Sequence, residues 1–231
     1  MHHHPVIRAL LFDAAGTLIE PAEPVADVYA RHAAAFGQTL DPAMIHHRFR
    51  EAFNGIGDPD YEAYLDGDLA EREWWAWVVH TVFARTLDYP MPEGFFQSCF
   101  DSLFAHYEDS SAWRVFPEAR EVLDQAQRAG FRVAVVSNFD RRLHRVLKGA
   151  GLSFEFVLTS ADAKARKPDP SIFHQALERL ALSPDEVLHA GDSATADGAG
   201  ARGAGIEPYL LDRPHKDLRG FLDLALRRRG K

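Results

Sequence analysis

The sequence VIRALLFDAAGTLIE, at residues 6–20, carries the clearest structural signal in the chain. Its first half is almost wholly apolar and ends at Phe12, which is typical of a strand buried on both faces of a parallel sheet. Asp13 stops this run, and Gly16 and Thr17 follow it. Ligands of open α/β proteins bind just beyond the carboxyl ends of such strands. Asp13 is therefore a candidate nucleophile, and the competing interpretation is an ordinary turn with a solvated aspartate.

From Pro117 onward the sequence alternates between helical and strand patterns. Strands that alternate with helices are joined by right-handed crossovers and form a parallel sheet. The strand before Asp13 belongs to the same sheet, so the predicted fold class is α/β, with a three-layer Rossmann-like core. The predicted helices cover 118–129, 140–149, 169–180 and the Gly- and Ala-rich segment after 192, and the predicted strands cover 131–136, 154–158, 187–190 and 206–211.

The segment between these two parts has a helical pattern and no convincing strand. Apolar residues recur there at three- and four-residue steps, and prolines at 21 and 24 suit a linker into it. The predicted organisation is a discontinuous core domain, residues 1–20 and 113–231, with a helical bundle inserted as a cap domain over 21–112. Its helices are expected at 25–36, 42–54, 69–86 and 93–107, with Trp74, Trp77, Val78, Thr81 and Val82 facing inward and Trp75 left open.

Charge divides the 231 residues in the same way. Residues 21–112 hold 16 acidic and 5 basic side chains, whereas the rest hold 18 and 21, giving a net charge of −8 for the chain. This balance argues against nucleic acid or an anionic membrane as a partner. The lone Cys99 lies among phenylalanines and is expected to pack. With no secretory signal or membrane span, the expectation is a cytoplasmic protein, monomeric or homodimeric, that acts on a small molecule.

Polar side chains follow the predicted strands at the edge where ligands bind. The motifs DAAGT from Asp13, SN from Ser137, KPDP from Lys167 and GDSATAD from Gly191 stand in an order and spacing that resemble the four motifs of the haloacid dehalogenase-like (HAD) hydrolase superfamily. The helical insertion lies where the superfamily's helical-cap subclass carries one. The resemblance therefore implies a hydrolase, most simply a Mg²⁺-dependent phosphatase that acts on a small phosphorylated metabolite.

The resemblance also implies a role for each motif residue. Asp13 would attack phosphorus and form an aspartyl phosphate. Mg²⁺ prefers oxygen ligands, which Asp13, the carbonyl of Ala15 and Asp192 would supply, while Asp197 would help to hold the metal site.

The remaining motif residues are expected to handle the phosphoryl group. Ser137 would donate a hydrogen bond to it, and Lys167 would neutralise the charge that develops during transfer. Thr17 and Asn138 complete the expected catalytic set. Lys164 is the competing lysine, but Lys167 directly precedes the prolines of the third motif.

One position departs from the pattern of the phosphatases in the superfamily. These enzymes carry a second acid two residues after the nucleophile, where this chain has Ala15. A general acid is typically worth about 10² to 10⁴ in rate, so an alkoxide would leave slowly. Glu20, His46 and His47 are possible substitutes, although each is expected to be a surface or hinge residue. Acyl phosphates and other good leaving groups would need the acid less.

Three alternatives follow from Ala15. Phosphonoacetaldehyde hydrolases have an alanine there, but they use a cap lysine as a Schiff base, and residues 21–112 contain no lysine. Haloacid dehalogenases use the same nucleophile without metal, although they do not usually carry the Gly191-Asp192 pair. A phosphate- and Mg²⁺-binding module without turnover is the third alternative.

Some other features have less specific interpretations. The G-x-G-x-x-G match at 198–203 does not directly follow its strand, so its glycines are expected to pack a helix on the sheet. His189 is expected to be a buried core histidine, and His2, His3 and His4 a flexible terminus. Arg48, Arg50 and Tyr64 are the cap residues expected to be within reach of a substrate.

Overall fold

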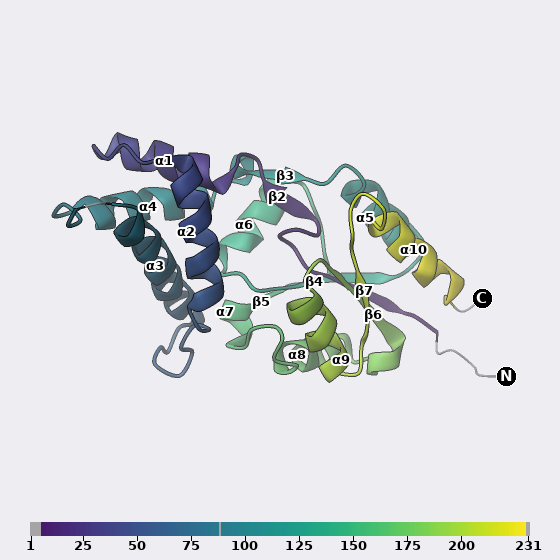
Figure 1. Ribbon diagram of the computed structural model, residues 1–231. Helices are drawn as coiled ribbons and strands as arrows, with labels where there is room; N and C mark the ends of the chain where they lie inside the picture. Colours follow the sequence, from purple (N-terminus) through teal and green to yellow (C-terminus); the bar gives the residue numbers. More distant parts are fainter. Residues whose placement is uncertain (1–5, 88, 230–231) are drawn as a thin grey trace.

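The computed structural model describes residues 6–87 and 89–229, so the histidines at 2–4 lie outside the described residues. A parallel sheet forms its centre, and its strand order is β5–β4–β1–β6–β7 (Figure 1). In β1, Ala9 pairs with Arg132 of β4 on one side and with Val187 of β6 on the other. The strands are β1 (Ala9–Phe12), β4 (Arg132–Ser137), β5 (Val157–Thr159), β6 (Val187–Gly191) and β7 (Glu207–Leu210).

Helices cover both faces of this sheet, as the apolar run before Asp13 predicts. Leu10 and Phe12 pack against α5, α6 and α10, whereas Ala9 and Leu11 pack against α8 and α9 on the opposite face. All four residues are fully buried. The three-layer α/β fold is confirmed, with α5 (Ala119–Arg128), α6 (Arg142–Gly149), α8 (Ser171–Leu180), α9 (Gly200–Gly203) and α10 (Leu218–Arg227) around the sheet.

The helices at 25–106 form a second body, which we call the helical body; the sheet and its flanking helices are the α/β body. Aspartates stand at two helix starts: Asp41 accepts from the Ala43 amide at 2.9 Å and Asp66 from the Asp68 amide at 3.0 Å. The helical body has its own hydrophobic cluster, separate from the two clusters that flank the sheet. Its helices are α1 (Val25–Ala35), α2 (Pro42–Gly55), α3 (Gly67–Thr86) and α4 (Phe95–His106).

The connection between the two bodies differs from the predicted linker. Residues Ile19–Pro21 form a strand, β2, which pairs antiparallel with β3 (Trp113–Val115). The entry and exit of the helical body are therefore joined by a two-stranded ribbon. Pro21 is tolerated because it stands at the last position of an edge strand, where its missing N–H costs little.

Short helical elements also escape sequence prediction. They are the helix α7 (Ser160–Ala163) and the 3₁₀ turns η1 (Ser110–Ala112) and η2 (Pro184–Glu186). The predicted Gly- and Ala-rich helix after residue 192 is present, but it begins as a π-helix, η3 (Ala194–Ala199), and continues into α9. In the described part of the chain, no helix is long and apolar enough to cross a membrane.

The prediction for Trp77 was wrong. Its side chain is 65% exposed, whereas Trp74, on the same helix α3, is 6% exposed. The buried face of α3 follows Trp74, Val78 and Val82 at four-residue steps, which leaves Trp77 on the side that faces solvent.

Candidate active site

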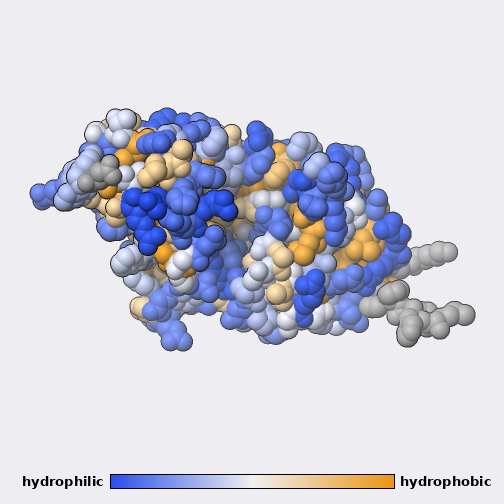
Figure 2. Space-filling model, in the orientation of Figure 1, coloured by the Kyte–Doolittle hydropathy of each residue, from blue (hydrophilic) through white to orange (hydrophobic). Residues whose placement is uncertain are grey.

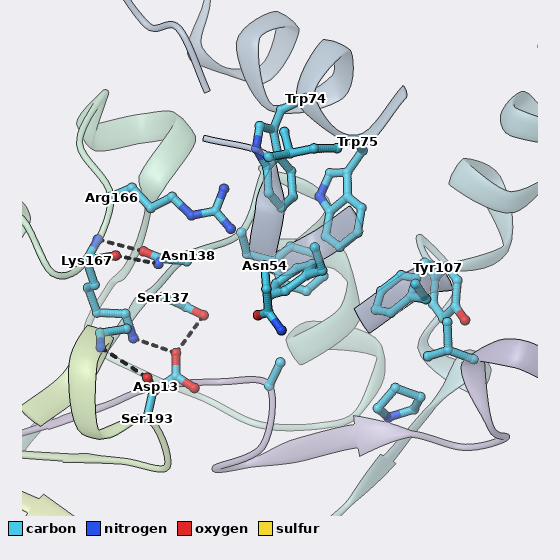
Figure 3. A pocket seen from close by; sticks show the side chains of 18 of the residues that line it. Asp13, Asn54, Trp74, Trp75, Tyr107, Ser137, Asn138, Arg166, Lys167 and Ser193 are labelled. Carbon is cyan, nitrogen blue, oxygen red and sulfur yellow. Dashed lines mark hydrogen bonds and ion pairs between the residues drawn. The ribbon is translucent and has the colours of Figure 1, made fainter. Parts of the chain in front are cut away.

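Three elements of the α/β body bring the predicted nucleophile, hydroxyl and lysine together (Figure 3). Asp13 follows β1, Ser137 ends β4, and Lys167 lies in the loop after α7. The Asp13 Oδ1 atom accepts hydrogen bonds from Lys167 Nζ at 2.7 Å and from Ser137 Oγ at 2.9 Å. All three side chains are buried, so the lysine and the aspartate form an ion pair shielded from solvent.

Two glycines allow the acidic residues to approach so closely. Gly16 has φ +87°, and a Cβ there would lie 2.3 Å from an Asp192 carboxylate oxygen. A Cβ on Gly191 would lie 2.1 Å from the Asp197 carboxyl carbon. Any other residue at either position would displace an aspartate of the site.

Asp197 is held by more hydrogen bonds than the other acids. Its Oδ1 accepts from Lys167 Nζ at 2.6 Å and lies 2.9 Å from His189 Nε2, while its Oδ2 accepts from the Ser193 amide at 3.0 Å. His189 is a fully buried core histidine, as predicted, and it supports Asp197. Asp197 thus shares the Lys167 ammonium with Asp13 and helps to fix its position.

The electrostatic balance of the site is negative. Burial raises the pKa of Asp13, and Asp197 adds to this effect while Lys167 opposes it. Burial, together with the charges of Asp13 and Asp197, raises the pKa of Asp192 to about 6. Burial works against the charge of Lys167, yet the two neighbouring aspartates hold its pKa above the ordinary value. One lysine is too little to balance three acids, so a cation would relieve their repulsion.

The acids also fit the donor set of a hard cation. Asp13, Asp192 and Asp197 each offer a carboxylate oxygen, and these atoms lie within 4.8 Å of one another. Mg²⁺ binds through a few carboxylates and retains open positions for water and phosphate oxygens. Among the described residues, Asp192 accepts no hydrogen bond from another side chain, so its carboxylate is available.

The other predicted residues occupy supporting positions. Asn138 accepts from the Lys167 amide at 2.8 Å and donates to the Lys167 carbonyl at 2.9 Å, which fixes the loop that carries the lysine. Thr17 is fully buried, and its hydroxyl has no hydrogen-bond partner in the described part of the chain. Lys164 is exposed and donates to the Leu65 carbonyl at 2.6 Å, away from Asp13.

Ala15 lines the cavity above Asp13, and no proposed substitute acid does. Glu20 is paired with Arg114 at 2.7 Å, His47 with Glu51 at 3.2 Å, and His46 is exposed. Among the described residues, the carboxyl groups that line this cavity are those of Asp13, Asp58, Asp192 and Asp197, and no histidine lines it. Asp58 lies beside Arg166 and is 73% exposed.

Above the acids the cavity opens into an apolar chamber of the helical body. The cavity has a volume of about 720 Å³, and the surface is hollowed between the two bodies (Figure 2). Trp74 and Trp75 of α3 extend into it in Figure 3. Arg48, Arg50 and Tyr64 do not line it. The aromatic side chains of the chamber are Tyr29, Phe49, Phe53, Trp74, Trp75, Phe100, Phe104 and Tyr107.

Sequence reasoning missed two features of this chamber. The sequence analysis did not assign Trp75 to the core or to a cavity, because helical spacing alone does not distinguish a cavity-lining face from a core face. Arg166 lies one residue before Lys167 and lines the cavity with its side chain 10% exposed. Its position beside Lys167 of the third motif was the one available signal.

Comparison with known proteins identifies the family. The sequence model of the family described as haloacid dehalogenase-like hydrolase matches residues 7–205 of this chain. The chain is 35% identical over 215 residues to the haloacid dehalogenase-like hydrolase domain-containing protein 3 of Mus musculus, covering 91% of this chain and 84% of that protein. The run SNFDRRL at 137–143, with VLTS and KPDP, resembles the same group.

Solved structures agree in fold. The HAD-hydrolase YfnB of Bacillus subtilis, bound to magnesium, has a TM-score of 0.72 at 17% identity and covers 96% of this chain and 99% of its own. The defluorinating L-2-haloacid dehalogenase Rha0230 has a TM-score of 0.68 at 20% identity, with 95% of each chain covered. At these identities the likeness shows the fold alone. The family match, the curated relative and the strand-end acids agree: the chain belongs to the haloacid dehalogenase-like hydrolases.

Proposed function

We propose that this hydrolase is a Mg²⁺-dependent phosphohydrolase that transfers a phosphoryl group from a small organic phosphate to Asp13. The observation that carries the proposal is the double hydrogen bond on Asp13 Oδ1. Lys167 and Ser137 both donate to this oxygen, and the free carboxylate of Asp192 lies within reach of the same site. We further propose that the α/β body, residues 1–20 and 113–231, is the catalytic domain and that residues 21–112 are its cap.

The roles follow from the contacts. With Oδ1 held by two donors, the other oxygen of Asp13 is left to attack or to bind a cation. Asp13, Asp192 and the Ala15 carbonyl would hold Mg²⁺, which when bound neutralises negative charge on the carboxylates and the phosphoryl oxygens. Lys167 supplies a fixed positive charge beside the transferred group, and Asp197 keeps its ammonium in place.

The reaction has two steps. A carboxylate oxygen of Asp13 forms a bond to phosphorus while the bond between phosphorus and the leaving oxygen breaks, and the leaving group takes the electron pair of that bond. Water then forms a bond to phosphorus and loses a proton to solvent, while the bond between phosphorus and the Asp13 oxygen breaks and its electron pair returns to the carboxylate. Inorganic phosphate is released and Asp13 is restored. Ser137 can turn its hydroxyl from Asp13 Oδ1 to a phosphoryl oxygen once substrate is bound.

Ala15 sets the chemistry of the leaving group. Because a methyl group stands where other phosphatases of the family carry an acid, the leaving oxygen departs without a protein proton donor. The two tyrosines of the cavity do not replace it, since burial raises the pKa of both Tyr29 and Tyr107 well above the ordinary value. Substrates whose leaving group is stable as an anion are therefore preferred.

A second function, 2-haloacid dehalogenation, is favoured by Ala15 and by the apolar lining of the chamber. In that reaction Asp13 would displace halide from carbon and no metal would be needed. The surplus of acids at the site argues against it, because a metal-free enzyme gains nothing from three clustered carboxylates. A phosphate- and Mg²⁺-binding module without turnover is the third possibility.

Release of phosphate from acetyl phosphate tests the proposal. The expected result is turnover with Mg²⁺ that stops with EDTA and in Asp13→Asn. Halide release from 2-chloropropionate that persists in EDTA would establish the dehalogenase. If neither reaction occurs and beryllofluoride with Mg²⁺ raises the melting temperature, the chain is a binding module.

A further inference from the structure

The chamber above the acids has the lining of an aromatic binding site. Phe53 contacts both Trp74 and Trp75, with ring centroids 5.5 and 6.0 Å apart, and the two tryptophans meet edge to face at 4.9 Å. The helical body offers this cavity few polar groups: Asn54, Asp58 and the hydroxyls of Tyr29 and Tyr107. A sugar would leave many of its hydroxyl groups unpaired in such a chamber.

Two arginines interrupt this apolar lining. Arg142 donates to the Asp140 carboxylate and to the Phe104 carbonyl, which leaves Arg166 as the arginine with free donors. The Arg166 side chain is 10% exposed, and its guanidinium lies over the Trp74 ring, 4.1 Å from the centroid. In Figure 3 the guanidinium points from the loop of Lys167 into the cavity. Among the described residues it makes no hydrogen bond, and its buried Nη1 atom has no partner. A buried guanidinium with free donors is costly unless a ligand supplies the acceptors.

Glu71 is the nearest buried carboxylate to Arg166 but does not satisfy it. The distance from Arg166 Nη1 to Glu71 Oε2 is 3.8 Å, too long for a hydrogen bond. The other carboxylate oxygen of Glu71 accepts from Tyr61 at 2.5 Å and from Ser160. Asp58 lies 3.9 Å from Arg166 Nε and is mostly exposed. The donor fork of Arg166 thus remains available to a carboxylate, whose geometry it matches.

We infer that the substrate is an aromatic phosphate that carries a carboxylate: the ring occupies the aromatic chamber, Arg166 binds the carboxylate, and the phosphate reaches Asp13. This inference rests on the proposed phosphohydrolase function. Ala15 supports it independently of the chamber, because a phenolate or an aromatic carboxylate leaves without protonation far more readily than an alkoxide. Three features thus indicate the same class of compound: the absence of an acid at Ala15, the aromatic chamber and the free guanidinium of Arg166.

Two matched pairs of substrates separate the ring from the carboxylate. Acetyl phosphate and benzoyl phosphate both release a carboxylate, so the ratio of their kcat/KM values measures how much the aromatic ring contributes to recognition. Phenyl phosphate and 3-carboxyphenyl phosphate release phenols of nearly equal acidity, so their ratio reports the carboxylate. We expect the wild type to prefer benzoyl over acetyl phosphate by about 10- to 100-fold. The carboxylated phenyl ester should be preferred by a similar factor of about 10 to 100.

Variants assign each preference to its residue. Arg166→Gln should abolish the preference for the carboxylated ester, and Arg166→Lys should restore part of it. Glu71→Gln is the matched control: if Arg166 were only the counter-ion of Glu71, both changes would act alike, whereas we expect Glu71→Gln to retain the preference. Trp75→Ala should lower the benzoyl preference about tenfold. The exposed Trp77→Ala on the same helix should not change it.

The outcomes distinguish this inference from the proposed function. Turnover of acetyl phosphate with both ratios near one overturns the inference and leaves the phosphohydrolase in place. A carboxylate preference that survives Arg166→Gln overturns the assignment of Arg166. If none of the four phosphates is hydrolysed, the proposed function fails and the inference fails with it.

Discussion

The two sides of the cavity are built differently. We call the strand-end residues around Asp13, Lys167 and Asp192 the floor, and the aromatic chamber of the helical body the roof. The floor comes from strand ends of the α/β body, and its charged groups are tied together: Lys167 contacts both Asp13 and Asp197 within 2.7 Å. The roof comes from the helical body, and most of the residues with which this body lines the cavity are aromatic. Under the proposed function, the floor would act on any phosphate that reaches it, and the roof would select which phosphates reach it. Changes in the floor should therefore affect all substrates alike, and changes in the roof should affect their ranking.

Ala15 stands where floor meets roof, and replacing it should have the largest effect. Ala15→Asp restores a proton donor beside the leaving oxygen. We expect kcat for alkyl phosphates to rise by about 10² to 10⁴, with little change for acyl phosphates, which need no acid. Steady-state phosphate release from both classes measures this. An equal rise, or none, for both would show that protonation of the leaving group does not limit the enzyme.

Lys167→Met removes the fixed charge of the floor. The expected loss in kcat is about 10²- to 10³-fold for every phosphate, with the ranking of substrates preserved. Lys164→Met is the control, since Lys164 bonds a backbone carbonyl away from Asp13. A change of ranking in Lys167→Met would mean that floor and roof are not separable.

Replacing two tryptophans of α3 tests which face of this helix is packed, because only the buried one should contribute to the free energy of unfolding. Trp74 is buried and donates to the Gly57 carbonyl at 2.5 Å, while Trp77 is exposed. Trp74→Ala should lower the free energy of unfolding by about 3–5 kcal/mol. Trp77→Ala should change it by less than about 0.5 kcal/mol. Urea titrations of both variants measure the difference, and equal losses would refute the assignment of the two faces.

The acids of the floor should make metal binding depend on pH. Because the pKa of Asp192 is raised to about 6, Mg²⁺ must displace a proton below that pH. We expect Mg²⁺ affinity to be constant above about pH 7 and to fall about tenfold per pH unit below about pH 6. The stability of the metal-free protein should depend on pH in the opposite direction to its Mg²⁺ affinity. A raised carboxyl pKa contributes stability that is fully present below the ordinary value of 3.8 and is lost as the pH rises through about 6.

Calorimetric titration with Mg²⁺ between pH 5 and 8 measures this dependence, with Asp192→Asn as the control. Affinity that does not change over this range would contradict the assignment of Asp192 as a ligand.

The floor could be predicted from the sequence because its residues follow strands. A buried apolar run fixes a strand, parallel strands share one edge, and the polar residues after Phe12, Val136 and Ala190 then have to meet. The choice of Lys167 over Lys164 came from the motif and agrees with the geometry.

The roof could not be predicted in the same way because its contacts are non-local. Arg166 is defined by Trp74 and Glu71 of the helical body, far away in sequence. The local sequence does not distinguish Trp74, Trp75 and Trp77. Only the packing of α3 makes Trp74 a buried residue at the cavity wall, Trp75 a partly buried one there, and Trp77 an exposed residue. The strand at 19–21 was missed because three residues with a proline carry almost no pattern, and its partner at 113–115 lies beyond the helical body.

Mass spectrometry of acid-quenched enzyme tests the central claim most directly. The protein is mixed with Mg²⁺ and acetyl phosphate, quenched within the first turnover, and digested. We predict that the peptide containing Asp13 gains the mass of one phosphoryl group, and that Asp13→Asn gains none. Phosphate release without a phosphorylated peptide, or with the phosphoryl group on another residue, would contradict the assignment of Asp13 as the nucleophile.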